Sequence, residues 1–197
     1  MSDPQPPKPA KLIISLFMKE KNRVEPAAGE LERAFGPVDL AGPWFDFDFT
    51  DYYRREMGAP LFRRMLAFKE PIEQARLADI KHRTNQIERH FSGDDGRRIN
   101  IDPGYLVPER FVLATAKNFT HRIYIGRGIY ADLTLVYTKG GFQALPWTYP
   151  DYQTPEMIVF LDRVRNKYMA DVTPRHRCGT TDGEILQAPA GAGPSGH

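Results

Sequence analysis

The order in which strand-like and helix-like patterns follow one another constrains the fold of this chain more than any other feature. Residues 11–18 form a short apolar run typical of a buried strand, and apolar residues at helical spacing follow over 30–35. Residues 44–50 alternate aromatic and acidic side chains, which indicates a half-buried strand, and residues 61–69 are expected to form the next one.

The clearest helix is expected to begin at Pro71, which suits a first helical turn, and to end before Gly93. One stripe of this helix collects the residues that should face the core: Leu77, Ile80, Thr84, Ile87 and Phe91. Residues 97–101 then read as a strand that enters a turn at Asp102-Pro103-Gly104. The order β-α-β-β-α-β is the ferredoxin-like signature, an antiparallel sheet with both helices on one face.

A further antiparallel β-region is expected after this core. Its predicted strands cover residues 110–116, 121–125 and 129–137, and Gly126-Arg127-Gly128 is suitable for a hairpin between the last two. Thr154 is a good cap for a C-terminal helix. The predicted fold class is therefore α+β: a ferredoxin-like core with an appended antiparallel β-region and a C-terminal helix.

Both ends of the chain have the composition of disordered tails. Residues 1–10 are rich in proline, and the chain from Gly179 onward is dominated by Gly, Ala, Pro and Ser. The remainder has an ordinary globular balance, since the whole chain is 41% hydrophobic and 26% charged. We therefore expect one domain over residues 11–170, with tails over 1–10 and 171–197.

Charge and cysteine content narrow the class of protein. The net charge is +2, from 27 Lys and Arg against 25 Asp and Glu, which is too balanced to attract nucleic acid or an anionic membrane in bulk. Cys178 is the single cysteine, so the monomer can form no disulfide, and a reducing compartment is expected. Residues 1–10 lack the pattern of a secretory signal, and the apolar run 12–18 is too short to cross a bilayer. A cytoplasmic protein without a membrane partner is the resulting expectation.

Five segments resemble a domain-of-unknown-function family found in bacteria and archaea. They are FDFTDYY (47–53), NIDPGY (100–105), LATAKN (113–118), HRIYIGRGIYADLTL (121–135) and LPWTYPDY (145–152). The resemblance spans residues 11–169 and implies no particular reaction, although some members are labelled GTP-binding proteins.

The GTP-binding label finds no support in this sequence. The chain has no G-x-x-x-x-G-K-[ST] loop to hold phosphates. Gly126-Arg127-Gly128 lacks a third glycine, and Asn166-Lys167-Tyr168-Met169 lacks the acidic residue of a guanine-reading motif.

Acidic residues suggest a metal site. Asp46 and Asp48 share a strand face, Asp51 follows them, and Asp102 ends the predicted fourth strand. Asp48, Asp51 and Asp102 are the candidate ligands for Mg²⁺ or Mn²⁺, which favour oxygen donors. In a 4-1-3-2 order the second and fourth strands lie roughly 14 Å apart, so Asp102 joins only if the order differs or a loop curls back. The alternative is that Asp46 and Asp48 face solvent and that Asp102 forms a turn.

Basic residues suggest an anion site. Lys117, His121, Arg122 and Arg127 gather around one strand and the following hairpin, where they could grip a phosphate or carboxylate. Tyr149, in an aromatic and proline-rich segment, could wall the pocket or stack on a base. The alternatives are a solvated hairpin rim, with Arg122 and Arg127 paired to acidic neighbours, and a rigid lid around Tyr149.

Two classes of function follow. One is a metal-assisted enzyme acting on a phosphate-bearing substrate, such as a nucleotide or a nucleic-acid end. The other is a non-catalytic binding or scaffolding module for RNA, a metabolite or a protein, including a second copy paired at a sheet edge. The sequence favours a phosphate-bearing ligand and leaves open whether that ligand is turned over.

Overall fold

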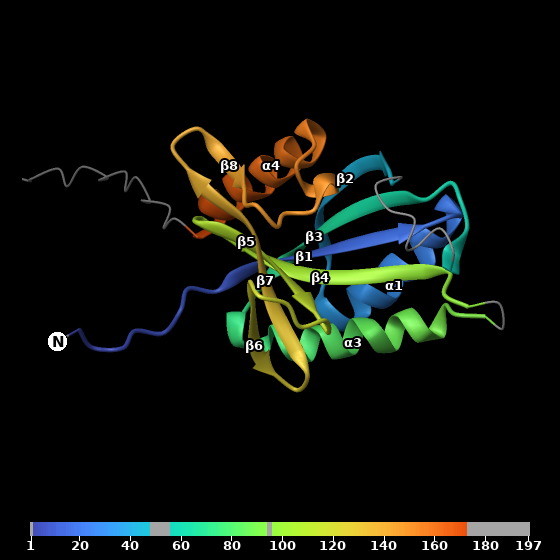
Figure 1. Ribbon diagram of the computed structural model, residues 1–197, viewed down its shortest axis with the longest axis horizontal. Helices are drawn as coiled ribbons and strands as arrows, with labels where there is room; N and C mark the ends of the chain where they lie inside the picture. Colours follow the sequence, from blue (N-terminus) through green and yellow to red (C-terminus); the bar gives the residue numbers. More distant parts are fainter. Residues whose placement is uncertain (1, 48–55, 94–95, 173–197) are drawn as a thin grey trace, which may run out of the picture.

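A single antiparallel sheet organises the α+β fold. The computed structural model describes residues 2–47, 56–93 and 96–172, and within them the strands follow the order β2-β3-β1-β4-β5-β7-β6, with β8 paired to β7 (Figure 1). The strands are β1 (Ala10–Met18), β2 (Val38–Asp46), β3 (Phe62–Ile72), β4 (Ile99–Val107), β5 (Arg110–Thr115), β6 (Arg122–Gly126), β7 (Ile129–Thr138) and β8 (Gly141–Ala144). The helices are α1 (Val24–Phe35), α3 (Leu77–His90) and α4 (Pro155–Val172), and the short 3-10 turns are η1 (Lys21–Arg23), η2 (Gln74–Arg76) and η3 (Pro150–Tyr152).

Helices cover both faces of the sheet. In Figure 1, α1 and α3 lie on one side of β1 and β4, and α4 lies on the other side beside β8. Every residue of β1 is buried, because successive side chains point to opposite covered faces. Leu12 and Ile14 enter the core under α1 and α3, whereas Ile13 enters the core under α4.

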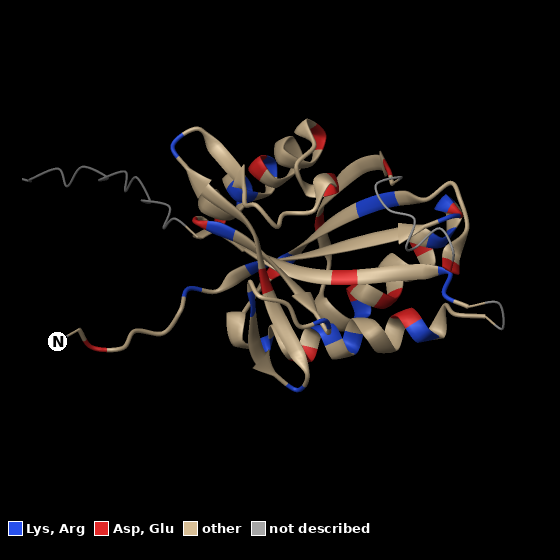
Figure 2. Cartoon of the chain, in the orientation of Figure 1, with Lys and Arg blue, Asp and Glu red and all other residues tan. Residues whose placement is uncertain are grey.

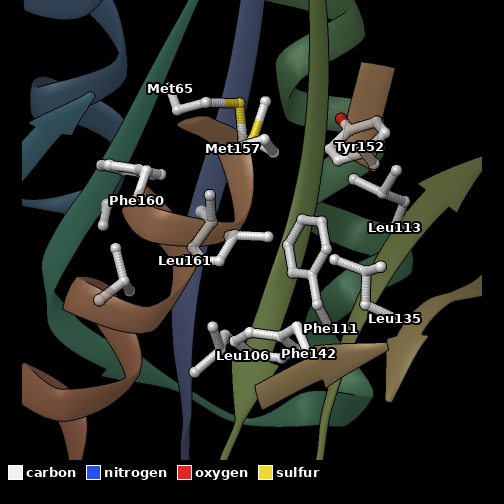
Figure 3. Close-up of a cluster of buried hydrophobic side chains, with 13 residues drawn as sticks. Met65, Leu106, Phe111, Leu113, Leu135, Phe142, Tyr152, Met157, Phe160 and Leu161 are labelled. Carbon is white, nitrogen blue, oxygen red and sulfur yellow. The ribbon is translucent and has the colours of Figure 1, made fainter. Parts of the chain in front are cut away.

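The core under α4 is built from large side chains (Figure 3). Leu161 of α4 lies between Phe160 of the same helix and Phe111 of β5, and all three are at most 2% exposed. The Thr154 hydroxyl accepts the Met157 backbone N–H at 3.3 Å, so the predicted cap of this helix is confirmed. This core occupies one end of the sheet face.

Most of the predicted elements are confirmed, with several shifted boundaries. Four of the five predicted stripe residues are buried in α3, namely Leu77, Ile80, Thr84 and Ile87, whereas Phe91 is partly buried and follows the helix. The strands predicted over 110–116, 121–125 and 129–137 correspond to β5, β6 and β7. The predicted start of a helix at Pro71 is wrong, because Pro71 lies in β3 opposite Lys11 and α3 begins at Leu77. The strand predicted over 44–50 begins earlier, as β2, and β8 was not predicted.

The turn predicted at Asp102-Pro103-Gly104 is also wrong. These residues lie inside β4, opposite Ser15, Ile14 and Ile13 of β1. On its other side β4 pairs with β5 only from Gly104 to Val107.

Pro103 and Gly104 explain where this pairing stops. The N–H and C=O of Ile101 face away from β1, towards α3 side chains. Backbone groups alternate in direction along a strand, so Pro103 presents its nitrogen on the same side, where it has no hydrogen to donate to β5. At Gly104, a Cβ would lie 2.4 Å from the Val112 carbonyl oxygen, so only glycine permits the close approach of β5. Beyond this point β4 and β5 diverge.

Basic and acidic residues are interspersed over strands and helices, as the near-zero net charge implies (Figure 2). In the part of the chain that the structure describes, no helix is both long enough and apolar enough to span a membrane.

Candidate functional site

A cavity of about 500 Å³ lies where β4 and β5 diverge. The unpaired part of β4 with α3 forms one wall, and the end of β5 with the loop that follows it forms another. The third wall comes from the segment around η3, and the stacked rings of Phe17 and Phe47, with centroids 4.8 Å apart, also line it. The cavity therefore reaches from α3, on one face of the sheet, to Leu113 and Tyr152, which pack in the α4 core on the other face.

Two side chains of α3 form hydrogen bonds with the backbone groups of β4 that have no partner on β5. Lys81 Nζ donates to the Ile101 carbonyl at 3.1 Å and to Asp102 Oδ1 at 2.8 Å. Glu88 Oε2 accepts the Ile101 N–H at 2.8 Å. Because backbone groups without a partner are costly when buried, these bonds stabilise the divergence of the two strands.

The polar network continues along β4. Asn100 Nδ2 donates to Asp102 Oδ2 at 2.6 Å, and Arg97 Nη1 donates to Asn100 Oδ1 at 2.5 Å. Arg97 also makes a bidentate pair with Glu56, at 3.0 and 2.8 Å. Such connected networks hold polar side chains in fixed orientations.

Two carboxyl groups of this wall are shifted in opposite directions. Burial raises the pKa of Glu88, and its contacts with the Ile101 N–H, Arg97 and Lys81 do not offset that effect. Burial acts in the same direction on Asp102, but Lys81, Asn100 and Arg63 outweigh it and lower the pKa of this carboxyl. Carboxyl groups with separated pKa values are common at functional sites, and also occur in structural networks.

Arg63 of β3 is a buried cation on the cavity lining. It is 4% exposed, and its guanidinium carbon lies 4.6 Å from the Phe47 ring centroid and 4.8 Å from that of Tyr152. It forms an ion pair with Asp151, and its Nε has no hydrogen-bond partner among the described residues. Burial works against the charge, but Tyr152 and Asp151 outweigh it and raise the pKa of the guanidinium.

Arg122 of β6 is held on the opposite wall by three bonds. Its Nε donates to Asp132 Oδ2 at 2.9 Å, its Nη1 to the Lys117 carbonyl at 2.9 Å and its Nη2 to the Tyr149 hydroxyl at 3.0 Å. Burial opposes its charge, and Asp132 and Tyr149 more than compensate, so the pKa of Arg122 is raised. The side chain is thereby kept charged and fixed.

The lining of the cavity is rich in charge of both signs. Its cationic residues are Arg63, Lys81, Arg97, Lys117 and Arg122, and its acidic residues are Glu88, Asp102, Asp132 and Asp151. Five positive charges against four negative ones give a net charge of +1, and adding Glu56, the bidentate partner of Arg97, brings the sum to zero.

The structure brings together four of the predicted site residues. Asp102, Lys117, Arg122 and Tyr149 all line the cavity, although Asp102 and Lys117 were predicted as parts of separate clusters. β2 and β4 are separated by β3 and β1, as the 4-1-3-2 order requires. Asp102 lines the same cavity as the basic residues because those residues lie on the β5 side of β4.

The other predicted residues lie elsewhere. His121 is next to the cavity, where its Nε2 lies 3.3 Å from Asp132 Oδ2. Arg127 is apart from it: its side chain pairs with Asp79 of α3, and its carbonyl accepts from His82 Nε2 at 2.9 Å. Asp48 and Asp51 lie outside the described residues. Within those residues, no group of three or more His, Cys, Asp or Glu side chains is placed to hold a metal ion.

Several lining residues were not predicted as part of a site: Arg63, Lys81, Glu88, Arg97 and Asn100. Arg63 had one sequence signal, since it interrupts an otherwise apolar strand. Lys81 and Glu88 are seven residues apart and so lie on the same face of α3, but nothing local indicates which strand they reach.

Comparison with known proteins places the chain in a family. No curated protein and no solved structure matches it. One family model matches residues 8–168, which cover nearly all of the described fold. The chain therefore belongs to the family described as Domain of unknown function (DUF4416).

Proposed function

We propose that the cavity between β4 and β5 binds a small molecule that carries a phosphate group, such as a nucleotide. The observation that carries this proposal is Arg63, a buried guanidinium on the cavity lining whose Nε donates to no described residue. Buried hydrogen-bond donors are rarely left without a partner, and an anionic oxygen would supply one.

The other walls of the cavity suit the same ligand. Each terminal nitrogen of Arg122 has two hydrogens, and the bonds to Lys117 and Tyr149 use one on each. The volume is within the range of roughly 300–1,000 Å³ that small-molecule sites occupy. The Phe17 and Phe47 rings, which are stacked on each other, add an apolar part to the cavity lining.

Side-chain cations rather than a bound ion would neutralise most of the ligand charge in this proposal. Asp102, the one predicted metal ligand within the described residues, is already bonded to Lys81 and Asn100. A requirement for Mg²⁺ or Mn²⁺ would therefore point to the predicted Asp48 and Asp51.

We also infer that residues 11–107 form a ferredoxin-like core, within one domain over residues 11–170. The antiparallel order β2-β3-β1-β4 supports this inference, because it is the 4-1-3-2 order of that fold. The placement of α1 and α3 on one face of these strands supports it too (Figure 1).

A thermal-shift screen tests the binding proposal. The purified protein is heated with inorganic phosphate, nucleotides and nucleotide sugars, each with Mg²⁺, with Mn²⁺ and with a chelator. A ligand at about 100 times its dissociation constant stabilises the folded state by about 2.7 kcal/mol, which raises the melting temperature by several degrees.

Two arginine variants sharpen the screen. Arg122→Gln should weaken binding by about 10- to 100-fold, since a bond to a charged group is worth about 1.5–3 kcal/mol. Arg127→Gln is the matched control, because Arg127 lies outside the cavity lining and should leave affinity unchanged. No shift with any phosphate-bearing compound, or equal loss in both variants, would contradict the proposal.

A further inference from the structure

Three rings lie beside the cavity, and we call Phe119, His121 and Trp147 the aromatic platform. The His121 side chain is only 9% exposed, because both of the other rings contact it. The rings of His121 and Trp147 are stacked, with centroids 4.9 Å apart and an interplanar angle of 8°. Phe119 meets His121 edge-on at 5.4 Å. Phe119 is 63% exposed and Trp147 is 38% exposed, which is unusual for rings of this size.

The platform is fixed in place rather than loosely attached. Trp147 Nε1 donates to the Leu133 carbonyl at 2.8 Å, so the polar edge of the indole is bonded within the protein. The Arg122 backbone N–H donates to the Phe119 carbonyl at 3.0 Å, which ties the loop carrying Phe119 to the first residue of β6. A fixed ring loses little entropy when a planar partner stacks on it.

A short chain of contacts joins the platform to the cavity. His121 Nε2 lies 3.3 Å from Asp132 Oδ2, and the same carboxylate oxygen accepts from Arg122 Nε at 2.9 Å. Arg122 in turn donates to Tyr149, whose ring is on the cavity lining and is 52% exposed. The platform is therefore connected to the cavity lining through His121, Asp132, Arg122 and Tyr149, in that order.

This sequence of groups matches the chemistry of a single strand of nucleic acid. Bases stack on exposed aromatic rings regardless of sequence, and neighbouring cations meet the phosphates between them. A neutral sugar would use the rings but would not need the cations, and a free phosphate would use the cations but not the rings.

We propose that the two exposed rings of the aromatic platform, Phe119 and Trp147, stack the bases of a single-stranded nucleic acid whose terminal phosphate enters the cavity. This inference rests on the proposed function, because the cavity supplies the phosphate site. It adds a substrate class, a strand end rather than a free nucleotide. Lys117 and Arg122, the neighbouring cations, can neutralise at most about two phosphates, so log K should fall with log salt at a slope no steeper than about −1.4.

Tryptophan fluorescence tests the proposal on the intact chain. The protein has two tryptophans, so Trp44→Phe leaves Trp147 as the only reporter. The probes are octathymidylate with a 5′ phosphate, with a 3′ phosphate and with neither, and thymidine 5′-monophosphate. We expect one phosphorylated octamer to quench Trp147 and to bind at least about tenfold more tightly than the mononucleotide, since each stacked base adds to affinity.

A second pair of variants separates stacking from folding. Phe119→Ala removes a ring that is mostly in solvent, and it should weaken octamer binding about tenfold without changing the melting temperature. Val159→Ala removes an apolar side chain of α4 that is 60% exposed, and it should leave binding unchanged. Equal weakening by both variants would overturn the proposal.

The probes also distinguish this proposal from the one on which it rests. If the mononucleotide binds as tightly as the octamers, the strand proposal is wrong and the cavity remains a nucleotide site. If an octamer binds and Arg122→Gln does not weaken it, the phosphate site is wrong instead. If none of the probes quenches Trp147, the strand proposal is wrong. The thermal-shift screen then tests independently whether the cavity binds a phosphate-bearing compound.

Discussion

Lys81 Nζ of α3 lies 2.8 Å from Asp102 Oδ1 of β4, and this ion pair joins the helix to the strand at the point where β4 is no longer paired with β5. The same ammonium group bonds the Ile101 carbonyl, so one side chain serves both the backbone and the carboxylate. The Lys81 side chain is 8% exposed and that of Asp102 is 30% exposed, which makes the pair partly buried. The pair is therefore important for the shape of the cavity as well as its charge.

Replacing Lys81 tests this role. Lys81→Met should lower the free energy of unfolding by about 1–3 kcal/mol, because the Ile101 carbonyl and Asp102 lose a charged donor. In an Asp102→Asn background the same replacement should cost about 1 kcal/mol less, which urea unfolding of all four proteins would measure. An equal cost in both backgrounds would mean that the two residues do not interact.

Glu88 gives the fold a predictable dependence on pH. Its raised pKa means that the folded state holds the proton more tightly than the unfolded chain does. The resulting stabilisation is fully present below the ordinary carboxyl value of 4.5 and is lost as the pH rises through the higher folded-state value. Glu88→Gln, which resembles the protonated form, should therefore gain stability relative to the native chain as the pH rises above 4.5.

Chemical unfolding at a series of pH values measures this difference. Asp102 contributes with the opposite sign, because its pKa is lowered, so its stabilisation is present above 3.8 and is lost at lower pH. Comparing Glu88→Gln with the native chain cancels that contribution. A difference that stays constant with pH, or that favours the native chain as the pH rises, would contradict the assignment.

Gly104 is expected to be indispensable to the pairing of β4 with β5. Gly104→Ala places a Cβ 2.4 Å from the Val112 carbonyl oxygen and should destabilise the fold by at least about 2 kcal/mol. Gly29→Ala is the control, since its Cβ meets nothing within 4 Å in α1, and it should stabilise by about 0.5–1 kcal/mol. Thermal unfolding distinguishes the two signs, and a tolerated Gly104→Ala would show that β5 can move away.

The cap of α4 supports the wall that holds Tyr149. Thr154→Ala should cost about 0.5–2 kcal/mol, because the Met157 N–H loses its acceptor, and Thr154→Ser should cost less since it keeps the hydroxyl. Equal unfolding midpoints for the native chain and Thr154→Ala would show that this bond contributes nothing.

Local patterns were sufficient to predict much of the fold. The stripe of α3 and the hairpin of β6 and β7 depend on residues close in sequence, so periodicity and glycine placement revealed both. Asp102-Pro103-Gly104 misled for a physical reason. Asp, Pro and Gly usually make a turn, but in this chain they lie inside β4 and mark the point where its pairing with β5 ends. That pairing depends on the position of β5, which local sequence does not reveal.

The candidate site was less predictable because its contacts are distant in sequence. Lys81 and Asp102 are 21 positions apart, and the cavity also needs Arg63 of β3 and Tyr149 before α4. Charge type and glycine content indicated Lys117 and Arg122, but the same reasoning selected Arg127, whose partner Asp79 is on another element. Arg122 lines the cavity and Arg127 does not, and this difference depends on the strand order and on where the pairing of β4 with β5 ends.

The central claim, that the cavity is an anion site, is tested most directly by the arginine side chains themselves. In ¹H–¹⁵N NMR spectra, the Nε–H signals of Arg63 and Arg122 can be assigned from Arg63→Lys and Arg122→Gln and followed during titration with inorganic phosphate and adenosine monophosphate. The account predicts saturable shifts of both signals, with the Arg127 signal unchanged. Shifts confined to Arg127, or no saturable shift at Arg63 and Arg122, would contradict it.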